Sequence, residues 1–376
     1  MSIKEKVFFP NLDGLRFLCF LSVFFFHSFF TNYTSISSDP VYHFIKKFLV
    51  HNGNIGVNFF FVLSGFLITF LLMKEKEQND EIDVVSFWMR RVLRIWPLYF
   101  FCVFFGFQVF PILKSYFGQT PNETAHLISY FTFSNNFDLI RNGLPDASIL
   151  GVLWSIAIEE QFYLVWPILL AILPVKMYKY LFALVIIVSL VFRVFNNNYI
   201  MSEFHTLSCI GDMAVGAFGA YIAHNERWKE KIVAFSKLQI VLIYVSFFTL
   251  FLFRGEILQS NPVINVFDRL IIAIFALLII LEQNYAKNSL FKLSKFKTIS
   301  GLGIVSYGLY CLHAVGILIT ITLTRLFHIN NNLWEVLILE TAMSLALTIL
   351  LSKISYNYFE VIFLRKKNEW AFFTKD

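Results

Sequence analysis

The sequence predicts an all-α fold, a polytopic bundle of about ten transmembrane helices with both ends of the chain on one side. Three observations carry this prediction. The 376 residues are 57% hydrophobic and 15% charged, with a mean hydropathy of +0.66, whereas soluble domains are about 45–50% apolar and about 25% charged. Apolar windows long enough to span a bilayer recur along the chain. The basic residues fall mainly into alternate connections between these windows.

The ten predicted spans and the charges between them fix the expected topology. The spans are placed at residues 13–34, 55–73, 95–113, 149–173, 178–195, 204–223, 238–254, 262–282, 301–325 and 333–356. The basic residues in connections on the side opposite the N-terminus are Lys46, Lys47, Lys114, Arg141, Arg254 and Arg325. The connections on the N-terminal side hold most of the others, from Lys4 and Lys6 to Lys375. Because an excess of Lys and Arg marks the cytoplasm, both termini are predicted to be cytoplasmic, in a multi-pass protein of the cell membrane.

No stretch of the chain is expected to form a separate soluble domain, so residues 1–376 are predicted to form one membrane domain. The longest outward connection, residues 114–148, is expected to be loop with one short helix around residues 124–133. The basic residues are spread among short connections, which argues against a nucleic-acid partner. The four cysteines lack metal-ligand or paired spacing and are expected to be small core residues, and no metal is predicted. These are Cys19, Cys102, Cys209 and Cys311.

The first span carries one arginine and one histidine in an apolar run. Arg16 and His27 are eleven residues apart, which on a helix makes three turns plus about 20°, so both side chains lie on one stripe about 16 Å apart along the axis. Polar groups inside a bilayer are costly and usually face the bundle interior, a partner or a water-filled cavity. We therefore expect this face to form half of an active site.

Three arginines, Arg90, Arg91 and Arg94, lie just ahead of the third predicted span, beside Trp88 and Trp96. One interpretation is a cytoplasmic anchor in which the tryptophans lie at the membrane interface. The other is a site for a phosphate-bearing ligand of the cytosol, because helical spacing lets these guanidinium groups converge on one polyanion.

The fourth span contains two adjacent carboxylates, Glu159 and Glu160, about ten residues from its outward end and therefore near the midplane. Adjacent helical positions point about 100° apart, so one carboxylate is expected to face a cavity and the other to reach a different helix. Ser155 lies four residues before Glu159 and shares its face. A structural hydrogen-bond network is the alternative to a functional pair.

The ninth span places Ser306, Tyr310 and His313 on one stripe, with His313 again near the midplane. His313 is expected to be either a hydrogen-bonded core histidine or part of the site. Further charges lie in the sixth and eighth spans, and we expect them to pair internally rather than act on a substrate. They are Asp212, Asp268 and Arg269.

These motifs together resemble acyltransferase family 3, the polytopic membrane acyltransferases that act on bacterial surface glycans. The resemblance covers nearly the whole chain and rests on LDGLRFLCFLSVFFFHS with the Arg16 to His27 spacing, GVNFFFVLSGFLIT at 56–69, Arg91 with Arg94, LWSIAIEEQFYLVWP at 153–167, SYGLYCLH at 306–313 and YFE at 358–360. Two positions depart from the family pattern. Asn58 stands where many members carry Asp, and Ile362 stands where a proline commonly follows the closing Glu.

The resemblance implies an enzyme that transfers an acyl group, most often acetyl, from cytosolic acyl-CoA to a hydroxyl of a glycan or lipid-linked saccharide. His27 then suits a general base on the acceptor hydroxyl or a transient acyl carrier, and Glu159 or Glu160 could orient its ring. Arg16 could hold the donor's thioester arm, and Arg91 with Arg94 its phosphates. Asp13, Ser155, Tyr310 and His313 are further candidates. Some family members carry an attached hydrolase-like domain, and here we expect transfer without one.

The alternative from another class is a transporter or flippase in which His27, Glu159 and His313 relay protons. Midplane titratable groups fit both functions, but the sequence shows no paired spans broken by Gly or Pro, as inverted repeats would give. Dependence on coenzyme A separates the two, because a flippase does not consume a thioester. The sequence carries no signal of oligomeric state.

Overall fold

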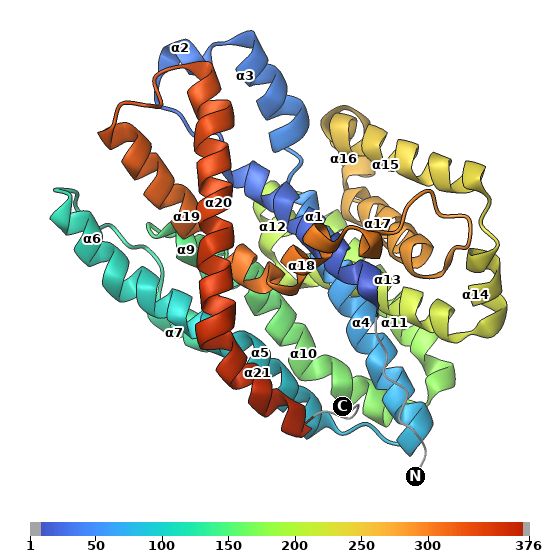
Figure 1. Cartoon of the computed structure of the whole chain (residues 1–376). Helices are drawn as coiled ribbons and strands as arrows, with labels where there is room; N and C mark the ends of the chain where they lie inside the picture. Colours follow the sequence, from blue (N-terminus) through green and yellow to red (C-terminus); the bar gives the residue numbers. More distant parts are fainter. Residues whose placement is uncertain (1–8, 371–376) are drawn as a thin grey trace.

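The computed structural model describes residues 9–370, which form helices and the turns between them, with no strand (Figure 1). The predicted all-α fold is confirmed. Lys4, Lys6 and Lys375, which contributed to the predicted topology, lie outside the described residues.

Eight helical stretches within residues 9–370 are long and apolar enough to cross a membrane. They are α4 (Ile55–Asn79), Val84–Tyr116 with α5 (Val84–Phe104), η2 (Phe105–Val109) and α6 (Phe110–Tyr116), Ser148–Ile172 with α9 (Ser148–Gly151) and α10 (Trp154–Ile172), Val175–Phe195 with η3 (Val175–Met177) and α11 (Tyr178–Phe195), α13 (Thr206–His224), α15 (Lys237–Ile257), α19 (Ser306–Leu326), and Glu335–Lys367 with η5 (Glu335–Glu340), α20 (Thr341–Ile354), η6 (Ser355–Glu360) and α21 (Val361–Lys367).

Two further helices, α1 (Pro10–His27) and α17 (Asp268–Tyr285), overlap the remaining predicted spans but are not among these eight stretches. The count of ten spans and the cytoplasmic termini stay predictions. The short helices connect the long ones. They are α2 (Thr34–Ser37), α3 (Pro40–Ile45), η1 (Lys46–Val50), α7 (Leu127–Phe131), α8 (Asn135–Asn142), α12 (Tyr199–Phe204), α14 (Glu226–Val233), α16 (Pro262–Asn265), η4 (Leu293–Lys295), α18 (Lys297–Ile304) and η7 (Asn368–Trp370).

Several predicted boundaries were wrong, each for a local reason. The first helix ends at His27 rather than residue 34, because Ser28 is extended and its hydroxyl bonds the Phe24 carbonyl at 2.7 Å. The third begins at Val84, where the Asp83 carboxylate accepts from the Ser86 amide at 2.9 Å. The arginines that follow therefore lie inside α5 and not ahead of it. The ninth span is divided at Val305 into α18 and α19.

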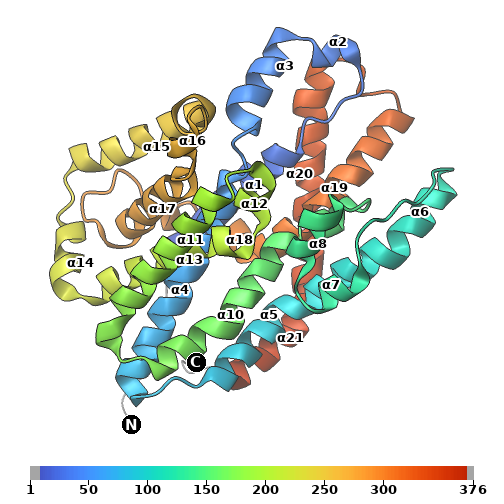
Figure 2. The ribbon, with the colours of Figure 1, turned by 180° about the vertical axis from the view of Figure 1, so that it is seen from behind.

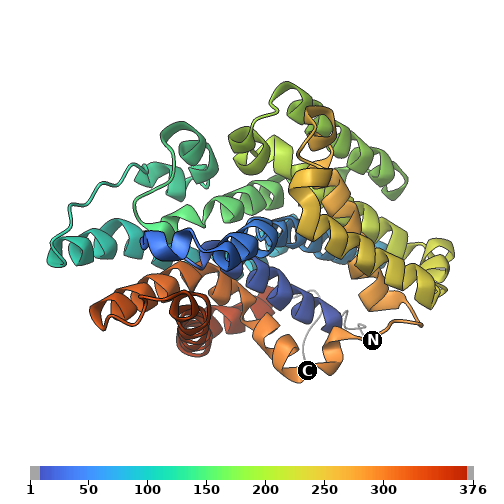
Figure 3. The same cartoon turned by 90° about the horizontal axis from the view of Figure 1, so that it is seen from above.

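Helix α4 is the centre of the bundle and packs against α1, α10, α13 and α17. Figure 3 shows the N-terminal helices, in blue, running through the middle of the molecule, and Figure 2 shows α15 and α17 on one flank with α5 and α21 on the other. The backbones of α4 and α13 approach each other closely. A Cβ on Gly65 would lie 2.0 Å from the Met213 carbonyl oxygen, and one on Gly216 would lie 2.1 Å from that of Val62. Only glycine permits this contact between backbones.

The buried charges that the sequence placed in the sixth and eighth spans pair with other charges, as predicted. The Arg254 guanidinium lies 2.6 Å from Asp268, and the Arg269 guanidinium lies 2.6 Å from Asp212 and 3.3 Å from Glu203. Because an unpaired charge at this depth is expensive, these contacts account for the buried acids without a catalytic role. The four cysteines are buried and unbridged, which confirms them as core residues.

Lys76, near the end of α4, is joined to the end of α10. Its ammonium donates to the carbonyls of Leu170, Ala171 and Leu173 at 2.7, 2.9 and 2.6 Å. The last carbonyls of a helix lack partners within the helix and carry partial negative charge. Lys76 therefore caps α10 and ties it to α4.

Candidate active site

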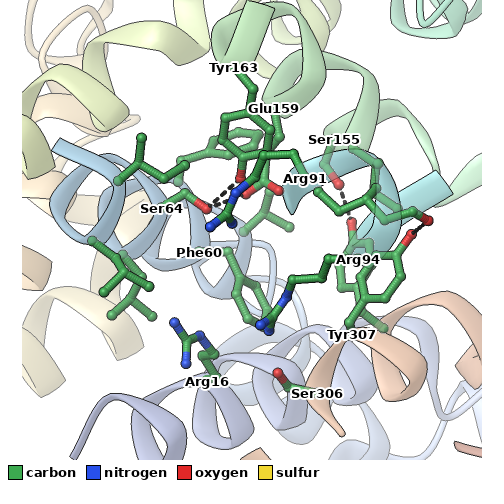
Figure 4. Close-up of a pocket in the computed structure, with 18 residues that line it drawn as sticks. Arg16, Phe60, Ser64, Arg91, Arg94, Ser155, Glu159, Tyr163, Ser306 and Tyr307 are labelled. Atoms are coloured by element: carbon green, nitrogen blue, oxygen red, sulfur yellow. Dashed lines mark hydrogen bonds between the residues drawn. The ribbon is translucent and has the colours of Figure 1, made fainter. Parts of the chain in front are cut away.

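A cavity of about 130 Å³ opens between α1, α4, α5, α10 and α19. Figure 4 shows its lining side chains, with Arg16, Arg91 and Arg94 directed into one space. Its polar lining residues are Arg16, Ser64, Arg91, Arg94, Ser155, Glu159, Tyr163, Ser306, Tyr307 and Tyr310. All ten belong to the motifs or the arginine pair quoted above for the family resemblance.

The cavity has an excess of positive charge. Arg16 pairs with Asp13 at 2.6 Å on its own helix. Arg94 has no hydrogen-bond partner within residues 9–370, and the Nε of Arg91 is buried without one. Donors left in this state favour an anionic ligand. Arg90 does not join them, because α5 turns it toward Glu75, at 3.5 Å, and the Trp370 carbonyl, at 2.8 Å. The expectation that all three arginines of α5 converge was therefore wrong for Arg90.

The two adjacent carboxylates separate as the helical geometry predicts. Glu159 lines the cavity and accepts from the Ser64 hydroxyl at 2.7 Å, and that hydroxyl is 3.0 Å from the Tyr163 oxygen. Glu160 points to α5 and accepts from the Trp96 indole at 2.8 Å. Both carboxylates thus hold helices together, while Glu159 is also accessible from the cavity.

Ser155 and Tyr310 meet on the far wall of the cavity. Their hydroxyls are 2.6 Å apart, and the Tyr310 hydroxyl also donates to the Val152 carbonyl at 3.2 Å. The ring of Phe60 packs edge-on against Tyr310 at 5.8 Å. Tyr310 therefore links α10 to α19 at the point where α19 leaves the cavity.

His27 and His313 lie beyond Tyr310 and do not line this cavity. Their ring centroids are 5.1 Å apart. His313 is 0% exposed, and its Nδ1 is 2.6 Å from the Tyr310 carbonyl oxygen. A carbonyl only accepts, so Nδ1 carries the proton and Nε2 of the neutral ring is an acceptor. Within residues 9–370 that buried Nε2 has no hydrogen-bond partner.

One stripe on α19 joins the two groups. Ser306 and Tyr310 line the cavity and His313 follows one turn later, beside His27. Arg16 and Ser306 line the same cavity, and His27 lies beside His313, so the stripe runs in the same direction as α1 from Arg16 to His27. The structure thus brings the predicted residues into two neighbouring groups, with the carboxylates of Glu159 and Glu160 bonded away from the histidines.

Sequence reasoning missed the partners that come from other helices. Ser64, Tyr163 and Trp96 hold the two glutamates, and Phe60 packs on Tyr310. One signal for Ser64 exists, because it is a polar residue in the apolar stretch 56–69. The aromatic residues carry no such signal in a chain with 47 phenylalanines.

The comparisons with known proteins agree with the motifs. A family model described as an acyltransferase domain matches residues 9–353. The peptidoglycan O-acetyltransferase OatA of Listeria monocytogenes is 28% identical over 95% of this chain and 56% of its own length. The O-acetyltransferase OatA of Staphylococcus aureus strain NCTC 8325 is 28% identical over 96% of this chain and 58% of its own. No solved structure matches the chain.

The chain spans a little over half the length of these curated relatives. The family model, in contrast, covers nearly all of the described helices and every candidate site residue. The predicted enzyme class, an acyltransferase, is the class of that family. The chain therefore belongs to acyltransferase family 3, as its motifs predicted.

Proposed function

We propose that this protein is a membrane O-acetyltransferase that moves an acetyl group from cytosolic acetyl-CoA to a hydroxyl of a cell-surface glycan. One observation carries the proposal: the arginine-lined cavity and the histidine pair are joined by the polar stripe of α19. An anion-binding group and a proton-accepting group at the two ends of one path are what such a transfer requires. The end of the path with the arginines faces the predicted cytoplasmic side.

The donor would be held by its phosphates and its narrow arm. Arg91 and Arg94 suit the phosphates, because both retain donors without protein partners. The cavity of about 130 Å³ is below the range of about 300–1,000 Å³ that encloses a drug-sized ligand. It therefore suits the pantetheine arm better than the whole coenzyme. The arm would pass Arg16 and follow the stripe of Ser306 and Tyr310 toward His27.

The chemical step would take place at His27. The acceptor hydroxyl attacks the thioester carbonyl carbon while His27 accepts its proton. The new C–O bond forms, the C–S bond breaks, and the departing thiolate takes a proton from the imidazolium. His313 is a positioning residue in this scheme, because its free Nε2 can accept an N–H from the ring of His27 and hold it in one orientation.

The acceptor follows from the relatives and from the position of His27. The two relatives are named as O-acetyltransferases, one of them acting on peptidoglycan, and we propose peptidoglycan or a related surface glycan here. His27 is exposed at the end of α1, on the predicted outer side. The acceptor would enter there, in a protein of the cytoplasmic membrane with both termini in the cytosol.

The experiment measures thioester consumption by purified protein in nanodiscs with labelled acetyl-CoA. We expect the native chain to release coenzyme A and to transfer label to water or added peptidoglycan fragments. His27→Ala should reduce turnover by about 10²–10⁴-fold, the typical contribution of a positioned base. Exposed His328, which lies outside the site, gives the control His328→Ala. Full turnover by His27→Ala would refute its role, and the absence of both turnover and coenzyme A binding would favour transport over transfer.

A further inference from the structure

A second, larger cavity of about 630 Å³ lies between α1, α4, α15 and α17 and shares no lining residue with the candidate site. Its lining is almost wholly apolar, with phenylalanines from α1, α4 and α15. The polar side chains in its wall are already bonded. The Ser22 hydroxyl donates to the Gly53 carbonyl at 3.0 Å, and the Tyr244 hydroxyl donates to Glu282 at 2.8 Å. The cavity therefore presents only apolar surface to a ligand.

The cavity is elongated along α1. Leu15 and Phe25 both line it, and ten helical steps between them span about 15 Å. The hydrocarbon core of a bilayer is about 30 Å thick, so this length equals about one leaflet. An apolar space of that length beside transmembrane helices fits a lipid hydrocarbon tail.

A polar pocket of about 620 Å³ adjoins the apolar cavity. Three segments give consecutive residues to the two spaces: Phe25 and Phe26 in α1, Ile45 and Lys46 where α3 meets η1, and Phe251 and Leu252 in α15. Consecutive helical residues point about 100° apart, so the spaces share an edge on each segment.

The polar pocket carries unneutralised basic groups. Its lining includes His43, Lys46, Lys47 and His51 against the single carboxylate of Glu256. Glu256 is paired with Lys47 at 2.7 Å. Lys46 has no carboxylate partner within residues 9–370, and its ammonium lies 5.6 Å from the ring centre of Tyr42. The pocket therefore retains a cation for an anionic ligand.

A buried, incompletely bonded amide supports the same ligand. Asn52 lines the pocket and is 2% exposed. Its Nδ2 donates to the Phe251 carbonyl at 2.7 Å, whereas its Oδ1 is buried without a partner. The bonded carbonyl lies just before Phe253, where α15 is kinked. An acceptor of this kind requires a donor such as a hydroxyl, which a lipid head group can supply.

From these adjoining spaces we infer a lipid site: an anionic phospholipid lies between α15 and α1, with its tail in the apolar cavity and its phosphate beside Lys46. A hydroxyl of the head group reaches Asn52. The head then lies beside Phe26, whose ring is 5.1 Å from that of His27. The lipid thereby fills the space behind the catalytic histidine and holds α15 to the bundle.

The test measures lipid binding without acyl donor, so its result is independent of the proposed function. Purified protein is titrated in detergent with phosphatidylglycerol or phosphatidylcholine, and bound lipid is counted by native mass spectrometry. We expect phosphatidylglycerol to bind about fivefold more tightly than phosphatidylcholine, because one lysine near anionic lipid contributes roughly that gain in affinity. Lys46→Gln should remove this preference, whereas Lys297→Gln, at an exposed lysine of α18 away from both spaces, should preserve it.

The tail is tested by filling its cavity. Leu18 lines the cavity and is 41% exposed, so Leu18→Trp adds bulk there without disturbing the buried core. We expect Leu18→Trp to weaken the binding of both lipids, whereas Leu184→Trp, at a 57% exposed residue of α11, should leave binding unchanged. Equal affinity for the two lipids, or unchanged binding in Leu18→Trp with a native circular-dichroism spectrum, would overturn the inference. Displacement of phosphatidylglycerol by equimolar polyprenyl phosphate would overturn the choice of a phospholipid.

Discussion

The ring of His27 lies 5.1 Å from that of His313, whose buried Nε2 has no other hydrogen-bond partner within residues 9–370. The arrangement combines an accessible imidazole at the end of α1 with a second, buried imidazole fixed by a backbone carbonyl. In such a pair, one imidazole contacts the substrate and the other holds the first imidazole in a fixed orientation.

His313→Gln is expected to lower kcat by about 10²-fold while leaving the KM for acetyl-CoA within twofold, because the base keeps its place but loses its orienting partner. Steady-state kinetics in nanodiscs measure both constants. A KM that rises together with an unchanged kcat would instead assign His313 to donor binding.

Arg94→Gln is expected to raise the KM for acetyl-CoA about tenfold with little change in kcat, since hydrogen bonds to charged groups contribute about 1.5–3 kcal/mol. Arg90→Gln is the matched control, because Arg90 lies on the same helix but contacts Glu75 rather than the cavity. Equal effects of the two substitutions would show a general charge effect and would contradict a specific phosphate contact.

Gly216→Ala is expected to destabilise the bundle by about 1–3 kcal/mol, the usual cost of overpacking, because the new methyl group would collide with the Val62 carbonyl. Gly255→Ala is the control in α15, where an added Cβ meets nothing within 4 Å. Thermal unfolding of the two variants in one detergent compares them. Equal melting temperatures of the two variants would show that α4 and α13 can move apart without loss of stability.

Asp146 provides a pH-dependent contact in the outward loop. Burial opposes ionisation of this carboxyl, but the amide of Asn122, at 2.9 Å, and the ammonium of Lys114, at 2.5 Å, hold its pKa below the ordinary value. A lowered pKa adds stability above the unfolded value of about 3.9, and this is lost as pH falls through the folded value. Asp146→Asn is therefore expected to cost about 1 kcal/mol at pH 7. The melting temperatures of the variant and the native protein should converge at acid pH. A difference that stays constant with pH would contradict a stabilising role for the ionised Asp146 carboxylate.

The sequence predicted relations within one helix well. The stripe shared by Ser306, Tyr310 and His313, and the divergence of Glu159 from Glu160, follow from the helical period. That Asp212 and Arg269 would each find an internal partner followed from the cost of burying charge, although the sequence did not say which partner. Periodicity and burial are properties of a single segment, so they can be read without the fold.

Relations between helices could not be predicted in this way. The turn of α5 that directs Arg94 inward and Arg90 toward Glu75 depends on how neighbouring helices pack. The partnership of His313 with His27 depends on α19 lying beside α1. The outward loop was expected to hold one short helix, whereas the structure has α7 and α8 there. A local sequence sets the period of a helix but not its rotation against its neighbours.

The contact of Lys76 with the end of α10 has a mechanical consequence for Glu159. Helices α4 and α10 are joined at Lys76 and again at the bond between Ser64 and Glu159. The two joints are twelve residues apart on α4 and eleven apart on α10, to Leu170, or about 18 and 16 Å along the axes. Two contacts this far apart along the axes prevent α4 and α10 from sliding or rotating relative to each other. The carboxylate of Glu159 therefore occupies a fixed position in the cavity, set in part by a lysine at the far end of the same helices.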